Sequence, residues 1–460
     1  MLSCLFLRKV CAGMKKYKDL KKTVAVATLG CKVNQCESAS FQSCFEEQGY
    51  TVNPFGAAAD IYVINTCAVT AKAAAQSRQL IRRAQRTNPQ AKVVVTGCYA
   101  QIAPQKIREI EADPILIVGN ANKHQIFEAA VSDDVPFQAF QQNQAGAYFN
   151  DITVQNEISL LPVKRFSGRT RAFLKVQDGC NNFCSYCIVP YARGSSRSLV
   201  QEKVVSQAHL YAKEGHREIV LTGIHVGHYG LDLKPAVTLL DLLKKLTAAT
   251  PDIRYRLSSL EPTEISCELL EFMASVDNFM PHLHIPLQSG SDTILKKMRR
   301  RYTPEEFIEK VCRCKELLPA AAIGVDVLVG FPGETEKDFL QTYETVTKLP
   351  VTYLHVFPYS KRPGTPAAKM TPQVAREIKN ERVAVLRKLD HKKRNDFYAS
   401  RIGEVHAVLV ETERAVDGLA KGFTDNYIPV HFKARPNDAN RVVPVKLESL
   451  QERFVIGTPL

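Results

Sequence analysis

The chain has 460 residues, 45% hydrophobic and 23% charged, a normal globular mixture that is too long for one ordinary core and predicts about three domains. No apolar run approaches the roughly 20 residues that a membrane-spanning helix needs, so we expect no membrane association. Lys and Arg outnumber Asp and Glu by 61 to 47, and this net charge of +14 favours a polyanionic partner, nucleic acid before a membrane surface.

Residues 1–21 read as an N-terminal extension. Their apolar stretch is interrupted by Arg8 and Lys9 and precedes most of the positive charge, the reverse of a secretory signal. Met14 offers a more ordinary start. We therefore expect a cytoplasmic protein, in which thirteen cysteines indicate metal ligands or catalytic groups rather than disulfides.

The segment 22–140 alternates strand and helix patterns. The runs 24–30, 61–66 and 92–97 are short, apolar and rich in β-branched residues, and helical stretches separate them. This predicts an N-terminal parallel α/β domain. The polar, weakly periodic segment 141–164 is typical of a linker.

From 165 to 397 the alternation of strands and helices resumes. Six βα units predict a central partial (β/α)6 barrel, with the active site at the carboxyl ends of the strands. The expected strands are 172–177, 218–223, 254–259, 282–288, 323–330 and 353–359.

The last segment, 398–460, carries no helix signal. Short strand patterns at 405–411, 427–433 and 441–450 are separated by turn-rich stretches. A small antiparallel β-barrel is the natural closure for such strands. The whole chain is therefore predicted to be α/β with a C-terminal β-barrel.

Three cysteines at CxxxCxxC spacing follow the first strand of the central domain, in DGCNNFCSYC over 178–187. Cys180, Cys184 and Cys187 can bind three irons of a four-iron cluster and leave the fourth open to a small molecule. A structural zinc site is the alternative, but it needs a fourth ligand, and no other Cys or His lies near this loop in the sequence. Three unrelated buried thiols are the other alternative.

This motif, with IVPYARG at 188–194 and the cysteines of the first domain, resembles the methylthiotransferases of the radical S-adenosylmethionine (SAM) superfamily. The resemblance covers nearly the whole chain after about residue 22. It implies that the open iron binds SAM and that reductive cleavage of SAM yields a radical that abstracts hydrogen from an unactivated carbon. Catalytic roles for Cys180, Cys184 and Cys187 follow from it.

The resemblance also implies contacts to SAM at the ends of the barrel strands. The segments RLSSLEP (256–262), HIPLQSG (284–290) and GFPGE (330–334) match family segments, although each also reads as a plain βα turn. The expected cofactor-binding residues are Tyr186, Thr222, Gly223, Ser258, Ser259, Glu261, Gln288 and Gly330.

Cys31, Cys67 and Cys98 each follow one strand of the first domain. Because the ends of parallel strands share one edge, the three thiols can converge there, although each alone reads as a small buried hydrophobe. The resemblance of TLGCKVN (28–34) and NTC (65–67) to methylthiotransferases implies a second [4Fe–4S] cluster on these metal ligands. Asn34, Asn65 and Thr66 could donate hydrogen bonds to its sulfurs. We treat the other cysteines as ordinary thiols.

The tail resembles the TRAM domain, a small RNA-binding barrel, in GFTDNY at 422–427. Phe423 and Tyr427 are candidates for base stacking, and barrel core is the equal alternative. Two basic runs, 296–301 and the helix from Arg382 to Arg394, could follow the phosphate backbone, although charge runs are usually solvated helix faces.

Within the family, TLGCKVNQCES and the cysteine motif look most like the subgroup that modifies N6-threonylcarbamoyladenosine in tRNA, at carbon 2 and next to the anticodon. The alternatives are a sister enzyme acting on isopentenyladenosine or on a ribosomal-protein aspartate, and a non-catalytic RNA-binding iron–sulfur redox sensor. The expected partners are tRNA, SAM and an electron donor such as flavodoxin. The sequence does not give the sulfur donor or the oligomeric state.

Overall fold

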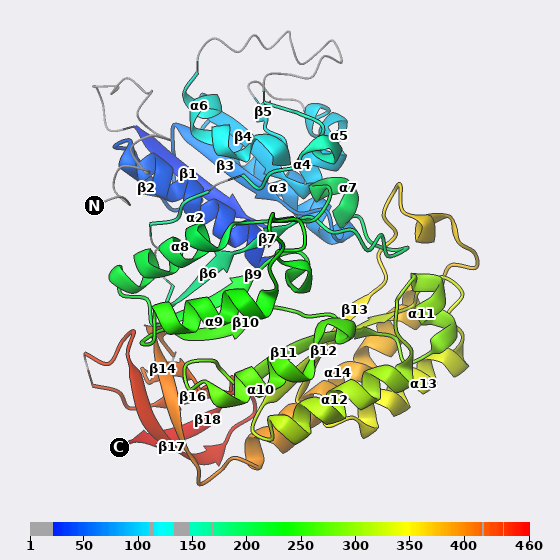
Figure 1. Cartoon of the computed structure of the whole chain (residues 1–460). Coiled ribbons are helices and arrows are strands. Elements are labelled where there is room, and N and C mark those ends of the chain that lie inside the picture. The colour runs from blue at the N-terminus through cyan, green and yellow to red at the C-terminus, as the bar shows by residue number, and fades with distance from the viewer. Residues whose placement is uncertain are drawn as a thin grey trace.

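The computed structural model describes residues 22–110, 115–132, 148–159, 161–164, 166, 169–415, 418–435 and 437–460. The expected N-terminal extension and part of the expected linker lie outside these residues. Three bodies follow one another from top to bottom in Figure 1: an N-terminal α/β domain, a central barrel and a C-terminal β-barrel. Among the described helices, none combines the length and the apolar character that a membrane span requires.

The first domain is built on a five-stranded parallel sheet with the order β2-β1-β3-β4-β5. The three predicted strands are confirmed, and two three-residue edge strands are added, which are too short to show a sequence pattern. The strands are β1 (Thr23–Thr28), β2 (Thr51–Asn53), β3 (Ile61–Thr66), β4 (Lys92–Gly97) and β5 (Ile115–Ile117).

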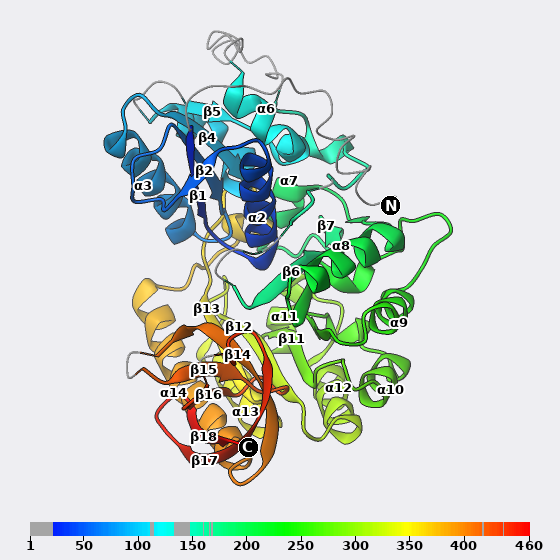
Figure 2. The ribbon, with the colours of Figure 1, turned by 90° about the vertical axis from the view of Figure 1, so that its left-hand side faces the viewer.

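Helices cover both faces of this sheet, as Figure 2 shows for α2 and α3. In α3, Thr70 caps the first turn by accepting from the backbone N–H of Ala73, and Ala74, Ile81 and Ala84 form one buried stripe at helical spacing. The helices are α2 (Lys32–Glu47), α3 (Ala71–Thr87), α4 (Cys98–Ile102), α5 (Pro104–Arg108) and α6 (Ile126–Val131).

The described part of the expected linker packs against its neighbours. Tyr148 and Ile152 are buried, and the backbone N–H of Gly119 donates to the carbonyl of Tyr148 at 2.9 Å. Arg197 of the central domain donates to the carbonyl of Gln155 at 3.2 Å. This connection therefore touches both the first and the central domains.

The central domain contains all six predicted barrel strands. They form two parallel three-stranded sheets, β10-β9-β6 and β11-β12-β13, which a hydrogen bond from Leu260 to His284 helps to join. Strands β6 and β13 lie at the outer edges of the half-open barrel. The strands are β6 (Arg171–Lys175), β9 (Glu218–Thr222), β10 (Arg254–Leu257), β11 (His282–Gln288), β12 (Ala322–Val329) and β13 (Tyr353–Pro358).

Helices on the outside of the barrel bury its apolar strands, and a two-stranded ribbon precedes and follows the cysteine loop. The outer helices are α8 (Gln201–Lys213), α9 (Leu239–Ala249), α10 (Cys267–Ser275), α11 (Asp292–Met298), α12 (Pro304–Leu317), α13 (Glu336–Lys348) and α14 (Arg376–Ala399). The ribbon is β7 (Gln177–Asp178) with β8 (Arg197–Ser198), and α7 (Val189–Arg193) lies between them.

The C-terminal body is a closed five-stranded barrel with the order β14-β15-β16-β18-β17. The expectation of an antiparallel barrel holds for all pairs except β16 with β18, which is parallel. Strand β15 lies in a stretch that the sequence predicts as a loop. The strands are β14 (Val405–Arg414), β15 (Ala420–Phe423), β16 (Pro429–Phe432), β17 (Val442–Leu450) and β18 (Val455–Pro459).

Candidate active site

Cys31, Cys67 and Cys98 come together at the carboxyl edge of the first sheet. They follow β1, β3 and β4, which are neighbours in the sheet, so the topology places the thiols side by side. Gly30 has a φ of +95°, and a Cβ there would lie 2.8 Å from the Cys67 Sγ. Only glycine therefore allows the loop carrying Cys31 to approach Cys67 so closely.

The environment of Cys67 and Cys98 favours their protonated form. Burial, and then the neighbouring Cys98, raise the pKa of Cys67 to about 11, and burial likewise raises the pKa of Cys98. Cys31 is exposed at the edge of the group. A cation bound between the three sulfurs would supply the charge that deprotonates them.

The amides beside this trio do not donate to its sulfurs, contrary to the sequence-based expectation. The Asn34 side chain donates to the carbonyls of Leu29 and Thr66, at 2.7 and 3.0 Å. Asn65 donates to the carbonyl of Asn34 at 3.0 Å, and the Thr66 hydroxyl donates to the carbonyl of Thr96 at 2.5 Å. These groups fix the cysteine loops because their donors are used on neighbouring backbone.

The second trio lies on the loop between β7 and α7. Cys180, Cys184 and Cys187 are all partly exposed, and the Cys187 N–H donates to the Cys184 carbonyl at 3.0 Å, which closes the loop into a turn. Burial raises the pKa of Cys187 to about 12. All eleven described cysteines are free thiols, consistent with the expectation of no disulfide framework.

The spacing of the sulfurs fits a cluster better than a single zinc ion. A tetrahedral zinc bound at about 2.3 Å needs sulfurs only about 3.8 Å apart. Within the described residues, the groups whose ligand atoms all lie within 4.8 Å of one another contain histidines and carboxylates, and neither cysteine trio is among them. The wider spacing suits a four-iron cluster, whose irons separate the thiolates.

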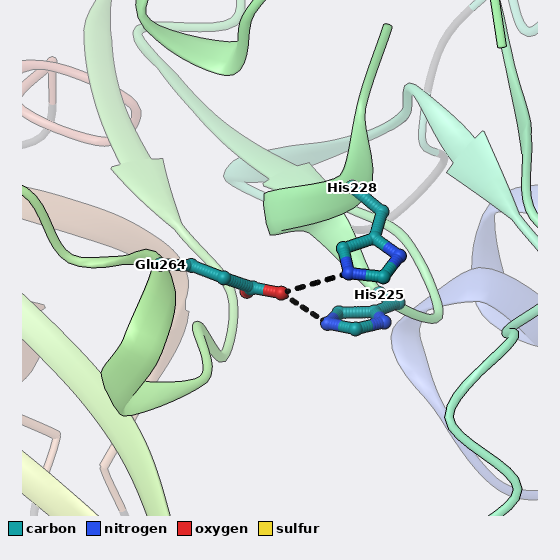
Figure 3. A group of neighbouring side chains, drawn as sticks. All are labelled: His225, His228 and Glu264. Atoms are coloured by element: carbon teal, nitrogen blue, oxygen red, sulfur yellow. Dashed lines mark ion pairs between the residues drawn. The ribbon is translucent and has the colours of Figure 1, made fainter. Parts of the chain in front are cut away.

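One of those histidine groups is drawn in Figure 3 and borders the second trio through its contact with Cys180. His225 and His228 stack with ring centroids 3.8 Å apart, and both face Glu264. The His225 Nδ1 lies 3.6 Å from the Cys180 Sγ. Burial disfavours a charged imidazole, but hydrogen bonds with Cys180 and Glu264 raise the pKa of His225 to about 10.

A second polar pair, Arg300 just after α11 and Glu261 after β10, borders the same loop. The Arg300 Nη1 lies 3.5 Å from the Cys184 Sγ, and Arg300 forms an ion pair with Glu261. Burial raises the pKa of Glu261. The loop is thus bounded by an imidazole near Cys180 and a guanidinium near Cys184, which can both balance negative charge on the sulfurs.

A buried ion-pair network joins the two cysteine sites. Arg193, from the IVPYARG segment, donates to Asn34 at 2.5 Å, to Asp178 at 2.8 Å and to Glu37 at 3.0 Å. Asn34 belongs to the loop of Cys31, and Asp178 to that of Cys180. Burial alone would raise the pKa of Glu37, but the charges around it hold that pKa well below its usual value.

The residues expected to bind the cofactor differ in their hydrogen bonding and backbone conformation. The Ser258 hydroxyl is buried and has no hydrogen-bond partner among the described residues, so it is free to meet a ligand. Gln288 has a φ of +65° at the end of β11, where the register with β12 shifts. The remaining residues of this group that lie near the loop or the strand ends are Tyr186, Thr222, Ser259 and Glu261.

The two glycines expected to contact the cofactor border protein side chains. A Cβ at Gly223 would lie 2.8 Å from Gln177 Oε1, and one at Gly330 would lie 2.1 Å from Lys379 Cγ. Gln177 Oε1 also accepts from the backbone N–H of His225 at 2.7 Å. Glycine at both positions therefore makes room for packing.

The structure corrects several RNA contacts expected from the sequence. Arg300 and Arg382 belong to the two basic runs, but they lie in buried ion pairs with Glu261 and with Glu334. Phe423 and Tyr427 stack on each other at 4.9 Å beneath the central barrel, and Arg171 lies over both rings. Arg300 and Arg382 are therefore used within the protein, whereas Phe423 and Tyr427 contribute to domain packing and stay partly exposed.

Sequence reasoning missed an exposed aromatic pair beside the second trio. Phe183 and Tyr191 are 47% and 43% exposed, with ring centroids 6.0 Å apart. It also missed His225, although His225 comes only three residues after Thr222. Its partner Glu264 gives no local signal, because the two residues meet only through the barrel fold.

Comparison with known proteins gives two family matches along the chain. Residues 23–119 match a family described as uncharacterized protein family UPF0004, and residues 174–346 match the radical SAM superfamily. Among solved structures, the radical SAM methyltransferase TsrM from Kitasatospora setae has a TM-score of 0.55 at 14% identity, covering 76% of this chain and 74% of that one. This likeness shows a shared fold.

Curated relatives are similar over nearly their full lengths. The threonylcarbamoyladenosine tRNA methylthiotransferase MtaB of Bacillus subtilis is 42% identical over 429 residues, covering 92% of this chain and 93% of the relative. The same-named protein of Aquifex aeolicus is 42% identical over 88% of this chain and 96% of its own length. A tRNA-2-methylthio-N(6)-dimethylallyladenosine synthase of Pelotomaculum thermopropionicum is 34% identical, covering 96% and 97%.

Proposed function

The chain belongs to the methylthiotransferase family of radical SAM enzymes, and from this premise we propose that it inserts a methylthio group at carbon 2 of N6-threonylcarbamoyladenosine in tRNA. The observation that carries the proposal is a pair of three-thiol sites, one at the carboxyl edge of the first sheet and one on the loop after β7, linked by the single side chain of Arg193. Insertion of sulfur at an unactivated carbon needs both a radical source and a sulfur source.

Enzymes of this family use SAM and [4Fe–4S] clusters. We assign Cys180, Cys184 and Cys187 to the cluster that binds SAM, and the sheet-edge trio of the first domain to the second cluster. When bound, the first cluster would supply reductive cleavage of the SAM sulfonium, and the second would supply the sulfur to be transferred. Three thiolates per cluster leave one iron of each open to a ligand.

The chain's own residues hold this machinery in place. Arg193 fixes the loop of Cys31 relative to the loop of Cys180, because it bonds to Asn34 on one side and to Asp178 on the other. Ser258 offers its unpartnered hydroxyl to the cofactor from the end of β10. Such positioning before substrate binds contributes to rate because reacting groups need little reorganisation.

The RNA partner is supported by the net charge of +14 and by the resemblance of the C-terminal barrel to a TRAM domain. We propose that Phe183 and Tyr191, exposed beside the thiols, contact unpaired bases near the target. An electron donor such as flavodoxin would supply the reducing electron, and the cytoplasm is the compartment where tRNA and such a donor meet.

The test is anaerobic reconstitution followed by two assays. With SAM and a strong reductant, the protein should release 5′-deoxyadenosine. With tRNA bearing threonylcarbamoyladenosine, mass spectrometry of the nucleosides should show its methylthio derivative. Cys267→Ala is a matched control, because Cys267 is an exposed thiol on α10 outside both trios, and it should keep both activities.

Two results would change the assignment. Methylthiolation of dimethylallyladenosine with none of threonylcarbamoyladenosine would place the protein with the sister enzymes. Absence of SAM cleavage by protein that carries its full iron would favour the non-catalytic redox sensor. In cells that lack this gene and any paralogue, persistence of the methylthiolated threonylcarbamoyl nucleoside would also exclude the proposed substrate.

A further inference from the structure

A cavity of about 640 Å³ lies inside the half-open barrel. Its walls come from the amino-terminal and middle parts of the barrel strands, and further lining residues come from the start of α2 and from the C-terminal barrel, including Asn426 and Tyr427. The volume falls within the range of pockets that enclose small molecules. Neither the cysteine trios nor the Ser258 hydroxyl line this cavity, so it is separate from the sites described above.

The cavity is rich in cations. Lys32, Arg169, Arg171, Arg256 and Arg394 line it, and the carboxylates in its lining are Glu411 and Glu413. This excess disfavours a metal ion and favours an anion. A ligand that carries an anionic group therefore suits the cavity.

Most of these cations already have partners. Arg171 pairs with Glu411 at 2.5 Å, and Arg394 with Asp390 at 2.9 Å. Arg256 pairs with Glu218 at 2.8 Å. In each case the positive charge is balanced within the protein, which leaves less of it for a ligand.

Lys32 differs from them. Within the described part of the chain, no carboxylate lies at ion-pair distance from its ammonium group. The nearby carboxylate, Asp326, is held by two imidazoles, with His284 Nε2 at 2.8 Å and His355 Nδ1 at 3.4 Å from the same oxygen. Among the lining cations, Lys32 and Arg169 are therefore the two without an ion pair to a described carboxylate.

The position of Lys32 in the chain adds a second argument. Lys32 directly follows Cys31, so its side chain starts beside the thiols that would hold the second cluster. In adenine, carbon 2 and the N6 amino group flank N1 on one edge of the ring. A base that presents carbon 2 to this region thus brings its N6 substituent near the same residues.

We propose that Lys32 binds the carboxylate of the substituent on N6 and thereby selects a base with an acidic substituent over one with an apolar substituent. This inference rests on the proposed function, in which that substituent is threonylcarbamoyl, an amino acid joined through its nitrogen with its carboxylate free. The dimethylallyl group of the sister substrate has no charge, so an ammonium group there would be desolvated without compensation.

The test compares three anticodon stem-loops that differ only at the target base: threonylcarbamoyladenosine, its methyl ester and unmodified adenosine. Because the acid and the ester carry the same phosphates and the same remaining substituent, the difference between their Kd values reports the carboxylate charge, and unmodified adenosine shows the effect of the whole substituent. At fixed salt, the reconstituted protein should bind the acid about tenfold or more tightly than the ester, as expected for a charge-assisted contact. Equal affinities would overturn the proposal.

Variants assign the contact to Lys32. In Lys32→Gln the ratio of acid to ester affinity should fall close to one, whereas Lys32→Arg should retain most of it. Lys348→Gln, at a side chain 80% exposed on α13, is the matched control and should keep the full ratio. A full ratio in Lys32→Gln would overturn the assignment.

The iron content of each variant is measured in parallel, so that loss of a cluster is recognised. If Lys32→Gln loses iron, the Kd values of the acid and the ester for the unsubstituted protein still decide whether the carboxylate is bound. Failure of the proposed function gives a different result: the protein would not methylthiolate tRNA bearing the acid. If the protein methylthiolates the acid-bearing RNA but binds the acid and the ester equally, the role of Lys32 is refuted and the proposed function stands.

Discussion

Arg193 and Glu37 form a buried ion pair, with the arginine Nη1 3.0 Å from the carboxylate Oε1. Glu37 lies on α2 of the first domain and Arg193 at the end of α7 in the central domain, so the pair ties the two domains together beside both cysteine sites. Lys123 and Lys175 also approach Glu37, and their charges compensate its burial.

We predict that Glu37→Ala lowers the free energy of unfolding by about 3–5 kcal/mol. The substitution leaves Arg193, Lys123 and Lys175 buried with only Asp178 to balance them. Urea unfolding followed by circular dichroism measures the loss. Glu344→Gln, which breaks an exposed pair of 4.0 Å with Lys348, should change stability by less than about 0.5 kcal/mol; comparable losses in both variants would contradict the network's role.

The approach of Gly30 to Cys67 gives a prediction about iron. In Gly30→Ala the new methyl group would overlap the Cys67 Sγ, at a φ that side chains rarely adopt. We expect this variant to hold about half of the iron of the reconstituted protein, close to four of about eight atoms per chain. Iron and sulfide analysis measures this.

The control for that variant is Gly403→Ala, since Gly403 also has a positive φ but has open space around it, far from the thiols in the chain. Gly403→Ala should keep all its iron.

Replacement of Cys31, Cys67 and Cys98 together by Ala should also halve the iron content. Unchanged iron in that triple variant would contradict a second cluster on these residues.

We predict that the two cysteine trios support different activities, SAM cleavage and sulfur insertion. Cys184→Ala should abolish cleavage of SAM, because it removes one thiolate of the cluster that binds the cofactor. Cys67→Ala should retain part of the cleavage and lose sulfur insertion. Measuring 5′-deoxyadenosine and methylthiolated nucleoside in the same reaction separates the two activities. Equal loss of both in a folded Cys67→Ala protein would contradict separate roles.

The exposed pair Phe183 and Tyr191 should contribute to RNA affinity. Replacing either ring by Ala should weaken binding of a tRNA anticodon stem-loop by about fivefold to a hundredfold, as expected when one base loses its stacking partner. Fluorescence anisotropy measures the Kd. Leu231→Ala removes a side chain 64% exposed on a neighbouring loop and should leave the Kd unchanged.

The C-terminal barrel should become less stable as pH rises, through His406. Burial alone would lower the pKa of His406, but hydrogen bonds to Asp425 at 2.8 Å and Glu404 at 3.0 Å raise it. A raised pKa means that the stabilisation is complete below about pH 6.5, the value of a free histidine, and is lost as pH rises through the folded-state pKa.

Amide hydrogen exchange of β14 provides the measurement. Corrected for the intrinsic exchange rate, protection in the unsubstituted protein should exceed that in His406→Gln at pH 6, and the difference should shrink as the pH is raised toward 9. A difference that stays constant over this range would show that the imidazole charge does not contribute.

Much of the fold could be predicted from the sequence because most of its strands have strong local patterns. The six barrel strands and the strands at 61–66 and 92–97 are β-branched, apolar runs bounded by turn residues. The short strands β2, β5, β15 and β18 escaped prediction, because their three to five residues acquire strand geometry from pairing with neighbours.

The convergence of Cys31, Cys67 and Cys98 could be predicted, since it follows from parallel topology alone. The ion-pair network could not. Glu37 and Arg193 are 156 positions apart, and no local pattern distinguishes a buried charge from one that is solvated on a helix face. For the same reason Arg300 and Arg382 look like phosphate contacts in the sequence and form buried ion pairs in the fold.

The two cysteine trios are brought together in different ways, and this affects when each can bind iron. The thiols at 180–187 are neighbours in any conformation of the chain, so iron can be delivered to them early. The other three are 36 and 31 residues apart and meet only once β1, β3 and β4 have paired. With the clusters assigned as proposed above, the second cluster can therefore be bound only after the first sheet has formed.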